Sequence, residues 1–184
     1  MKPLKFFILG MALLVCRSSE AGKFNFNMGY YSLSAISSTA KRGNVNNFGI
    51  YNLEYRLGVL SHFEIGLGYS ILMSNIIGGD LGYGPDFSLY WYPLTLTTAD
   101  RGSSDKVQYA STDLWKPYLG ISFSQRQFQA VQTNYAGFGL MVGLERVLTD
   151  VWSVQGLVNF HSYSGNASSS ATEFDYLGGI SFLF

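Results

Sequence analysis

The chain is poor in charge. Asp, Glu, Lys and Arg make up 13% of its 184 residues, whereas ordinary soluble domains contain about 25%. Twelve basic residues balance twelve acidic ones, so there is no basic field to attract nucleic acid, and we expect no nucleic-acid partner. A soluble domain needs more surface charge than this, but a membrane barrel does not, because lipid covers its outer face.

Long hydrophobic runs are also missing. After residue 22 there is no stretch of about 18 mainly apolar residues, the length that a transmembrane helix requires. A chain of this kind can cross a membrane only as strands, because only helices and closed barrels satisfy every backbone N–H and C=O group in lipid. The sequence therefore predicts a barrel if the protein lies in a membrane.

The first residues have the pattern of a secretory signal peptide. Lys2 and Lys5 give a positive start, and the apolar run at 6–15 is too short to span a bilayer. Small residues then occupy both positions that signal peptidase reads in the segment 19–21. We therefore expect residues 1–21 to be removed on export.

Cysteine is nearly absent, since Cys16 is the only one and lies inside the predicted signal peptide. Cleavage near Ala21 would leave 22–184 as a single mature domain without a disulfide. The alternative is a lipoprotein signal in which Cys16 carries the lipid. Val15 argues against it, because that position normally holds Gly, Ala or Ser.

Aromatic residues make up 16% of the chain, and there are 21 glycines. Apolar and small or polar residues alternate with a period of two. In the segment 63–74 the odd positions carry Phe, Ile, Leu, Tyr, Ile and Met, while the even positions carry mainly Glu, Gly and Ser. This alternation is typical of a strand, and its length suits a bilayer crossing at a tilt. Eight segments show it: 24–30, 51–57, 63–74, 82–91, 119–124, 137–145, 152–161 and 174–184.

The connectors fit an up-and-down path. Tight turns are predicted at 60–62 and 148–150, and one long connector, 94–113, is predicted to form a hairpin of 94–98 with 106–110. Barrels of the outer membrane combine short periplasmic turns with longer external loops. The predicted fold is an all-β, eight-stranded, antiparallel up-and-down transmembrane β-barrel. Its predicted external loops are 36–47, 75–80, 125–134 and 164–172.

Alternation alone permits a soluble carrier with apolar groups inside or a membrane barrel with apolar groups outside. The less apolar face consists of Gly, Ser and a few charges, which suits the narrow lumen of an eight-stranded barrel. Trp91, Trp115 and Trp152 all fall on the apolar face at one end of their segments. Aromatic side chains favour the membrane–water interface, so these three predict an interfacial girdle and a membrane barrel.

The last segment ends in Phe184, preceded on the same face by Phe182, Ile180 and Tyr176. Here the chain resembles the small outer-membrane barrels of the OmpA and OmpX type. The resemblance implies that these terminal residues are read by the outer-membrane assembly machinery. It also implies a bacterial outer-membrane location in contact with lipid and lipopolysaccharide, and a surface role through loops whose ligand the sequence does not identify.

Five charged residues are predicted to face the lumen: Glu54, Arg56, Glu64, Asp86 and Glu145. A buried charge is costly unless it is paired, and Arg56, the one evident cation, is expected to bridge two carboxylates. Barrels of the OmpA type carry Glu–Arg pairs that plug the lumen, so we expect a plugged barrel with a structural or surface-interaction role. The alternative is a narrow pore for small solutes or ions.

His161 is the candidate for a catalytic residue, because Ser162 follows it and Asp175 lies on the adjacent segment. The sequence His161-Ser162-Tyr163 partly resembles the His-x-Ser-Asn stretch of barrel-shaped lipid A deacylases, whose serine would be activated by histidine. Neighbouring residues on a strand face opposite ways, so Ser162 points away from His161. We expect no catalytic residues, no cofactor and, without a Cys/His cluster, no metal site, and keep a lipid-A-modifying hydrolase as the second alternative.

Overall fold

The computed structural model describes residues 22–36, 42–60, 62–73, 81–94, 96–97, 114–128, 133–165 and 169–184. Within them no helix is long and apolar enough to cross a membrane. The predicted signal peptide, residues 1–21, lies outside the described residues and stays a prediction. The strands are β1 (Gly22–Ile36), β2 (Arg42–Leu60), β3 (Phe63–Met73), β4 (Leu81–Trp91), β5 (Leu96–Thr97), β6 (Leu114–Phe128), β7 (Thr133–Val147), β8 (Trp152–Gly165) and β9 (Ser170–Leu183).

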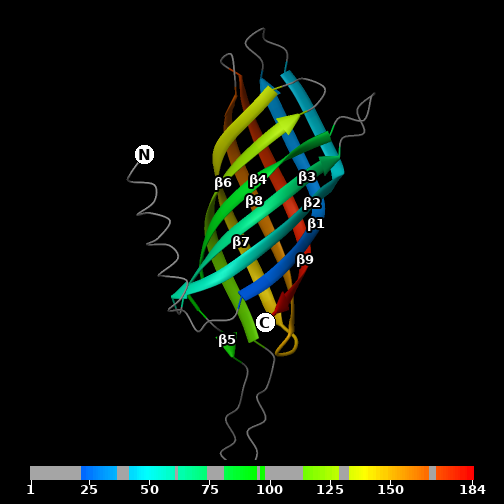
Figure 1. The fold of residues 1–184 in the computed structure, drawn as a ribbon. Coiled ribbons are helices and arrows are strands. Elements are labelled where there is room, and N and C mark those ends of the chain that lie inside the picture. Colours follow the sequence, from blue (N-terminus) through cyan, green and yellow to red (C-terminus); the bar gives the residue numbers. More distant parts are fainter. Residues whose placement is uncertain are drawn as a thin grey trace, which may run out of the picture.

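The sheet is antiparallel and closes on itself. The strand order is β4-β3-β2-β1-β9-β8-β7-β6-β5, and β4 also pairs with β6. Eight strands therefore form the wall, and the two-residue β5 pairs beside the lower end of β6 (Figure 1). Because the number of strands is even, the first strand begins and the last strand ends at the same end of the barrel. There the Phe184 N–H donates to the Gly22 carbonyl at 3.0 Å. This confirms the predicted eight-stranded up-and-down barrel.

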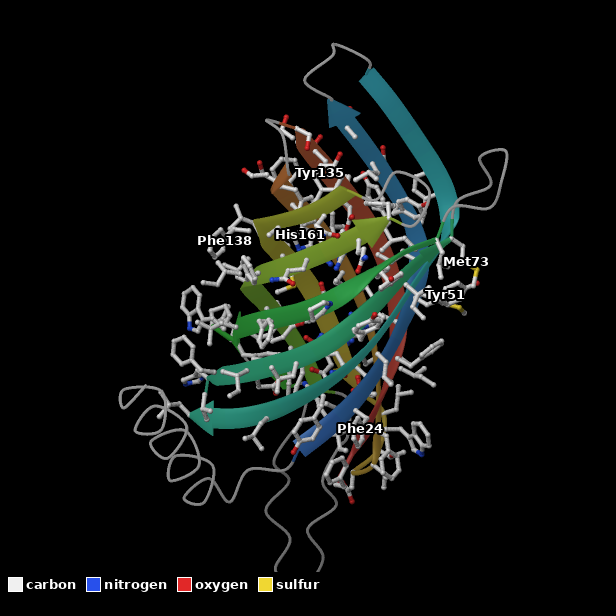
Figure 2. All side chains as sticks on the ribbon, turned by 45° about the horizontal axis from the view of Figure 1, so that its top comes forward. Phe24, Tyr51, Met73, Tyr135, Phe138 and His161 are labelled. Atoms are coloured by element: carbon white, nitrogen blue, oxygen red, sulfur yellow. The ribbon has the colours of Figure 1, made fainter. Side chains whose placement is uncertain are left out.

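Side chains alternate between the two faces of the wall, and the apolar ones point outward. Phe138 and Leu140 are 73% and 63% exposed, whereas Arg56 and Asp175 are 1% and 0% exposed. Figure 2 shows Phe24, Met73 and Phe138 projecting from the outside of the barrel, with His161 among the strands. A soluble protein has the opposite arrangement. Such an exposed apolar surface is the band that an outer-membrane barrel presents to lipid.

Above this band the outer face becomes polar while the strands continue. On β6 the apolar residues of the outer face end at the half-buried Phe123, and the exposed Gln125 and Gln127 follow on the same face. On β8 Phe160 is followed on the same face, towards the upper end, by Ser162 and Ser164. The upper end, opposite the C mark in Figure 1, thus forms a polar rim above the apolar band.

The predicted bounds of three upper loops were wrong for this reason. Residues 42–47, predicted as loop, pair with β1 from Ile36↔Arg42 to Tyr31↔Asn47. Parts of the predicted loops 125–134 and 164–172 likewise belong to β6, β7, β8 and β9. Polar residues in a strand that rises above the lipid lack the apolar alternation, but backbone pairing continues through them. The predicted loop 75–80 lies outside the described residues.

The lower end carries the two short connections β2–β3 and β7–β8, and also the long connector between β4 and β6. Between β7 and β8 the Thr149 hydroxyl accepts from the backbone N–H groups of Val151 and Trp152, which fixes the predicted turn at 148–150. In the long connector 94–113, Leu96 pairs with Trp115 and Thr97 with Leu114. The second strand of the predicted hairpin, 106–110, lies outside the described residues.

Candidate functional site: the charged barrel lumen

The polar face of the strands fills the barrel interior with two groups of charged side chains. The lower cluster is defined as Lys23, Glu54, Arg56, Glu64 and Glu145, and all but Glu64 are buried. The upper cluster is defined as Asp86, Arg126, His161, Glu173 and Asp175, all buried. Because neighbouring strands are in register, side chains that alternate inward on each strand meet in the narrow lumen.

Lys23 is the centre of the lower cluster. Its Nζ lies 2.9 Å from a Glu64 carboxylate oxygen and 2.8 Å from one of Glu145. The Ser153 hydroxyl donates to the other Glu145 oxygen at 2.6 Å. The Tyr92 hydroxyl lies within hydrogen-bond distance of Lys23, Glu64 and Glu145 at once. These contacts tie β1, β3, β7 and β8 together across the lumen.

Arg56 pairs with Glu54 and also donates from Nη1 to the Tyr92 hydroxyl at 3.4 Å. Its Nε donates to Glu54 at 2.6 Å, and its guanidinium lies 3.7 Å from the centre of the Tyr90 ring. The Tyr90 hydroxyl donates to the other Glu54 oxygen at 2.6 Å. The prediction that Arg56 bridges two carboxylates was wrong, because Lys23 takes Glu64 and Glu145.

The upper cluster is built around Arg126, which lies far along β6. Its Nη1 donates to Asp86 at 2.7 Å and its Nη2 to Glu173 at 3.2 Å. Asp86 also accepts from the Ser70 hydroxyl. Asp86 therefore pairs with a residue that the sequence analysis placed in a loop, and it lies apart from Glu54, Arg56 and Glu145.

Sequence reasoning missed Lys23 and Arg126, and Arg56 is thus not the one cation of the lumen. The signal was present in both cases. Lys23 continues the alternation of Phe24 and Phe26 by one residue towards the start of the chain, and Arg126 continues that of Phe123 towards the upper end. Both were overlooked because the strands were ended where the apolar residues end.

His161 reaches the upper cluster from β8. Its Nε2 lies 2.7 Å from the Ser122 hydroxyl and 3.2 Å from the Ser124 hydroxyl, both on β6. Its Nδ1 faces Glu173 and Asp175 on β9. Ser162 points to the outer face, as expected from strand alternation. The serines near His161 are therefore different from those considered in the sequence analysis.

Uncharged polar groups and a small cavity lie between the clusters. The Gln155 amide donates to the Asn27 side chain at 2.7 Å, and Asn27 in turn donates to Asn52 at 3.1 Å. The cavity has a volume of about 30 Å³ and is lined by residues of both clusters, including Arg56 and Asp175. It is about large enough for one water molecule.

The three tryptophans lie on the outer side at the lower end of their strands. Trp91 ends β4, Trp115 is the second residue of β6 and Trp152 begins β8. Trp91 and Trp152 are exposed, and Trp115 is half-buried with the Arg146 guanidinium 5.1 Å from its ring centre. This arrangement is the one that a girdle requires, and its contact with a membrane interface stays a prediction.

The terminal residues of β9 form part of an aromatic surface at the same end. Phe182 packs edge-on against Trp152, with ring centres 5.2 Å apart. Phe184 lies 5.5 Å from Phe24 across the seam between the first and last strands. Tyr176 and Ile180 are 53% and 50% exposed on the same face. These side chains are accessible from outside, and their recognition by assembly machinery stays a prediction.

A groove lies on the upper part of the outer wall, over the junction of β4 and β6. The pairing of these strands skips from Tyr83↔Gln127 to Asp86↔Ser124. Pro85, which has no N–H to donate, lies in the gap. The groove has a volume of about 420 Å³, and its lining includes Tyr69, Tyr83, Gln125, Gln127, Asn134 and Ser164.

No family model matches the chain, and no curated protein matches it. Solved structures do match its fold. The crystal structure of Neisserial surface protein A has a TM-score of 0.62 at 12% identity, covering 89% of this chain and 97% of the other. The outer membrane protein OprG from Pseudomonas aeruginosa has a TM-score of 0.52 at 13% identity, covering 90% of this chain and 97% of the other.

Likeness at these identities shows the fold. The closed antiparallel wall and the apolar outer band are properties of this chain itself, and a band of this kind requires lipid around it. The chain therefore has the fold of the small eight-stranded outer-membrane β-barrels, and its surface fits that location.

Proposed function

We propose that this protein is a non-enzymatic barrel of the bacterial outer membrane, with a sealed lumen and a structural or surface-interaction role. The observation that carries the proposal is the pair of buried charge clusters that cross the interior. Within each cluster, side chains from several strands bind one another across the interior, which supports a closed lumen.

The upper cluster supports the seal directly. Asp86 on β4, Arg126 on β6 and Glu173 on β9 form a continuous ion-paired bridge, and β4 and β9 lie on opposite sides of the closed wall. Lys23 makes a second bridge below it. The cavity between them, about 30 Å³, is far smaller than a hydrated ion path would need.

The burial of His161 supports a non-enzymatic role. His161 is 2% exposed, and its serine partners Ser122 and Ser124 are 4% and 0% exposed. A hydrolase acting on membrane lipid must bring its nucleophile to the lipid, whereas these hydroxyls face the lumen. Mass spectrometry of lipid A with and without the protein tests this, and loss of an acyl chain would contradict the proposal.

The polar rim supports a surface role. Gln125, Gln127 and Asn134 are exposed on the outer wall above the apolar band and help to line the upper groove. We propose that this rim lies at the level of lipopolysaccharide head groups and that the predicted external loops offer the contact surface for an extracellular ligand. Rigid walls that present loops are a common basis for binding.

Planar-bilayer recordings test the seal. Wild-type protein is expected to insert without steady single-channel steps, with insertion checked by heat-modifiable migration on a gel. The triple variant Asp86→Ala/Arg126→Ala/Glu173→Ala removes all three members of the upper bridge, so none of them is left as an unpaired charge, and it is expected to increase leak. Gln127→Ala, on the outer face beside it, is the matched control. Steady conductance of the wild type would favour the pore instead.

The rim is tested by the thermal shift that lipopolysaccharide produces. Gln127→Glu combined with Asn134→Glu places two negative charges in the groove and is expected to reduce the stabilisation, because lipopolysaccharide is anionic. Thr149→Glu adds charge at the exposed lower turn and serves as the control. An equal shift in all three proteins would contradict contact at the rim.

A further inference from the structure

We propose that His161, Glu173 and Asp175 form a binding site for a divalent transition-metal ion such as Zn²⁺ inside the lumen. The three side chains each offer one ligand atom, and these atoms lie within 4.8 Å of one another. One imidazole nitrogen and carboxylate oxygens form a donor set that zinc accepts. The proposal goes beyond the sealed-barrel function and does not depend on it.

His161 lies too far from either carboxylate for direct contact, at a spacing that suits an ion between the imidazole and the carboxylates. His161 Nδ1 lies 3.8 Å from an Asp175 oxygen and 3.9 Å from a Glu173 oxygen. Hydrogen bonds are shorter than this. Two ligands bound tetrahedrally at about 2.1 Å from zinc lie about 3.4 Å apart, so a small inward movement would complete the site.

The candidate ligand atoms of Asp175 and His161 are buried without other partners, whereas the Glu173 oxygen nearest to His161 Nδ1 accepts from Arg126 and Tyr163. Both oxygens of Asp175, the second oxygen of Glu173 and Nδ1 of His161 have no hydrogen-bond partner. Asp175 and Glu173 are 0% exposed and His161 is 2% exposed. A buried carboxylate without a partner carries a large desolvation cost, and a bound cation would remove that cost.

The charge around the site also favours a bound cation. Three carboxylates, those of Asp86, Glu173 and Asp175, lie around a single guanidinium, that of Arg126, among the residues that the structure describes. Arg126 binds Asp86 and Glu173 and makes no ion pair with Asp175. The cluster therefore has an excess of negative charge in a closed space, which a divalent cation would neutralise.

The surroundings of His161 prepare its free nitrogen for a metal. Ser122 holds Nε2 at 2.7 Å. When Nε2–H donates to Ser122, Nδ1 presents its lone pair to the two carboxylates. Tyr163 stacks on the imidazole with ring centres 5.5 Å apart and fixes the ring plane. Metal-binding histidines are typically oriented in this way through their second nitrogen. The cavity of about 30 Å³ that His161 and Asp175 help to line has room for a water ligand.

The test is retention of zinc by the untagged full chain in a Cys16→Ser background, which removes the only thiol. The protein is folded in detergent with Zn²⁺, dialysed against metal-free buffer and measured by atomic spectroscopy. One zinc per chain is expected. Asp175→Asn and His161→Gln are each expected to lower the affinity at least ~10-fold. Two controls should retain the metal: His62→Gln, which removes the only other histidine, and Glu145→Gln, which removes a buried carboxylate of the lower cluster.

Each outcome decides the proposal. Absence of zinc from the wild type, or its retention in both ligand variants, would overturn it, and the first result would mean that a proton shared by Asp175 and Glu173 neutralises the cluster. Loss of zinc in His62→Gln would place binding at the surface and overturn it as well. If the ligand variants fail to fold, X-ray absorption of the zinc-loaded His62→Gln protein decides, because an imidazole in the metal shell can then come only from His161.

Discussion

Replacement of Leu67 by arginine tests which medium surrounds the outer face. Leu67 lies near the middle of β3, is 52% exposed, and points outward between Tyr55 and Phe87 on the neighbouring strands. If lipid surrounds it, an arginine near the bilayer midplane should cost about 2–4 kcal/mol. If water surrounded it, a leucine-to-arginine change at an exposed site should stay within about 0.5 kcal/mol.

The measurement is equilibrium unfolding by urea from phospholipid vesicles, followed by tryptophan fluorescence. The matched control is Ser162→Arg, which places the same side chain on the outer face of β8 above the apolar band. Near the interface arginine should cost only about 0–1 kcal/mol. The difference between the two variants therefore reports depth in the bilayer, since the substituted side chain is the same.

Equal changes of less than about 0.5 kcal/mol in both variants would refute the reasoning. Such a result would mean that the apolar band does not contact acyl chains. A large cost for Ser162→Arg with none for Leu67→Arg would also refute it, because it would place the polar rim in the hydrocarbon.

Three further predictions concern the lumen, the wall and the last strand. Arg126→Met leaves the buried carboxylates of Asp86 and Glu173 without their cation and should lower the free energy of unfolding by about 3–5 kcal/mol in the same urea assay. The triple variant Asp86→Asn/Arg126→Met/Glu173→Gln should recover part of this stability. A loss below about 1 kcal/mol in Arg126→Met would contradict the bridge. Gly137→Ala would place a Cβ 2.0 Å from the Ser162 carbonyl oxygen and should cost about 1–3 kcal/mol. Gly156→Ala, with nothing within 4 Å of the new Cβ, should be neutral or stabilising by up to about 1 kcal/mol, and similar losses in both would argue against the packing described. Phe184→Ala should reduce assembly in cells while leaving folding yield in detergent unchanged. The control is Phe138→Ala, which removes another exposed aromatic side chain of the outer face. Equal effects of the two substitutions on assembly in cells would count against a terminal signal.

The wall of the barrel was predictable because its chemistry repeats every two residues. On β8 the alternation runs from Trp152 to Ser164 without a break, and the predicted inward and outward faces agree with the burial of each residue. In a barrel this pattern fixes strand, face and number together. The ends of the strands could not be predicted in the same way, because the apolar half of the pattern stops at Phe160 while backbone pairing continues to Gly165.

The ion pairs inside the lumen were harder to predict than the charged residues that face it. The inward direction of Glu54 and Arg56 followed from the alternation, but the pairing of Glu145 with Lys23 joins residues that are 122 positions apart. Which cation meets which carboxylate depends on strand register and barrel closure. Both are properties of the closed sheet that local sequence does not encode.

The sequence by itself determined the eight strands and their outward apolar face. Alternation gives the strands, the Gly- and Ser-rich face and the tryptophan positions place the apolar side chains outside, and only a closed barrel satisfies the backbone of strands in lipid. Only the tertiary structure decided how the interior charges combine. Closure of β4 against β6 and of β1 against β9 brings distant strands to within a few ångströms. That closure joins Arg126 to Asp86 and Glu173 and leaves Asp175 facing His161 without a hydrogen-bond partner.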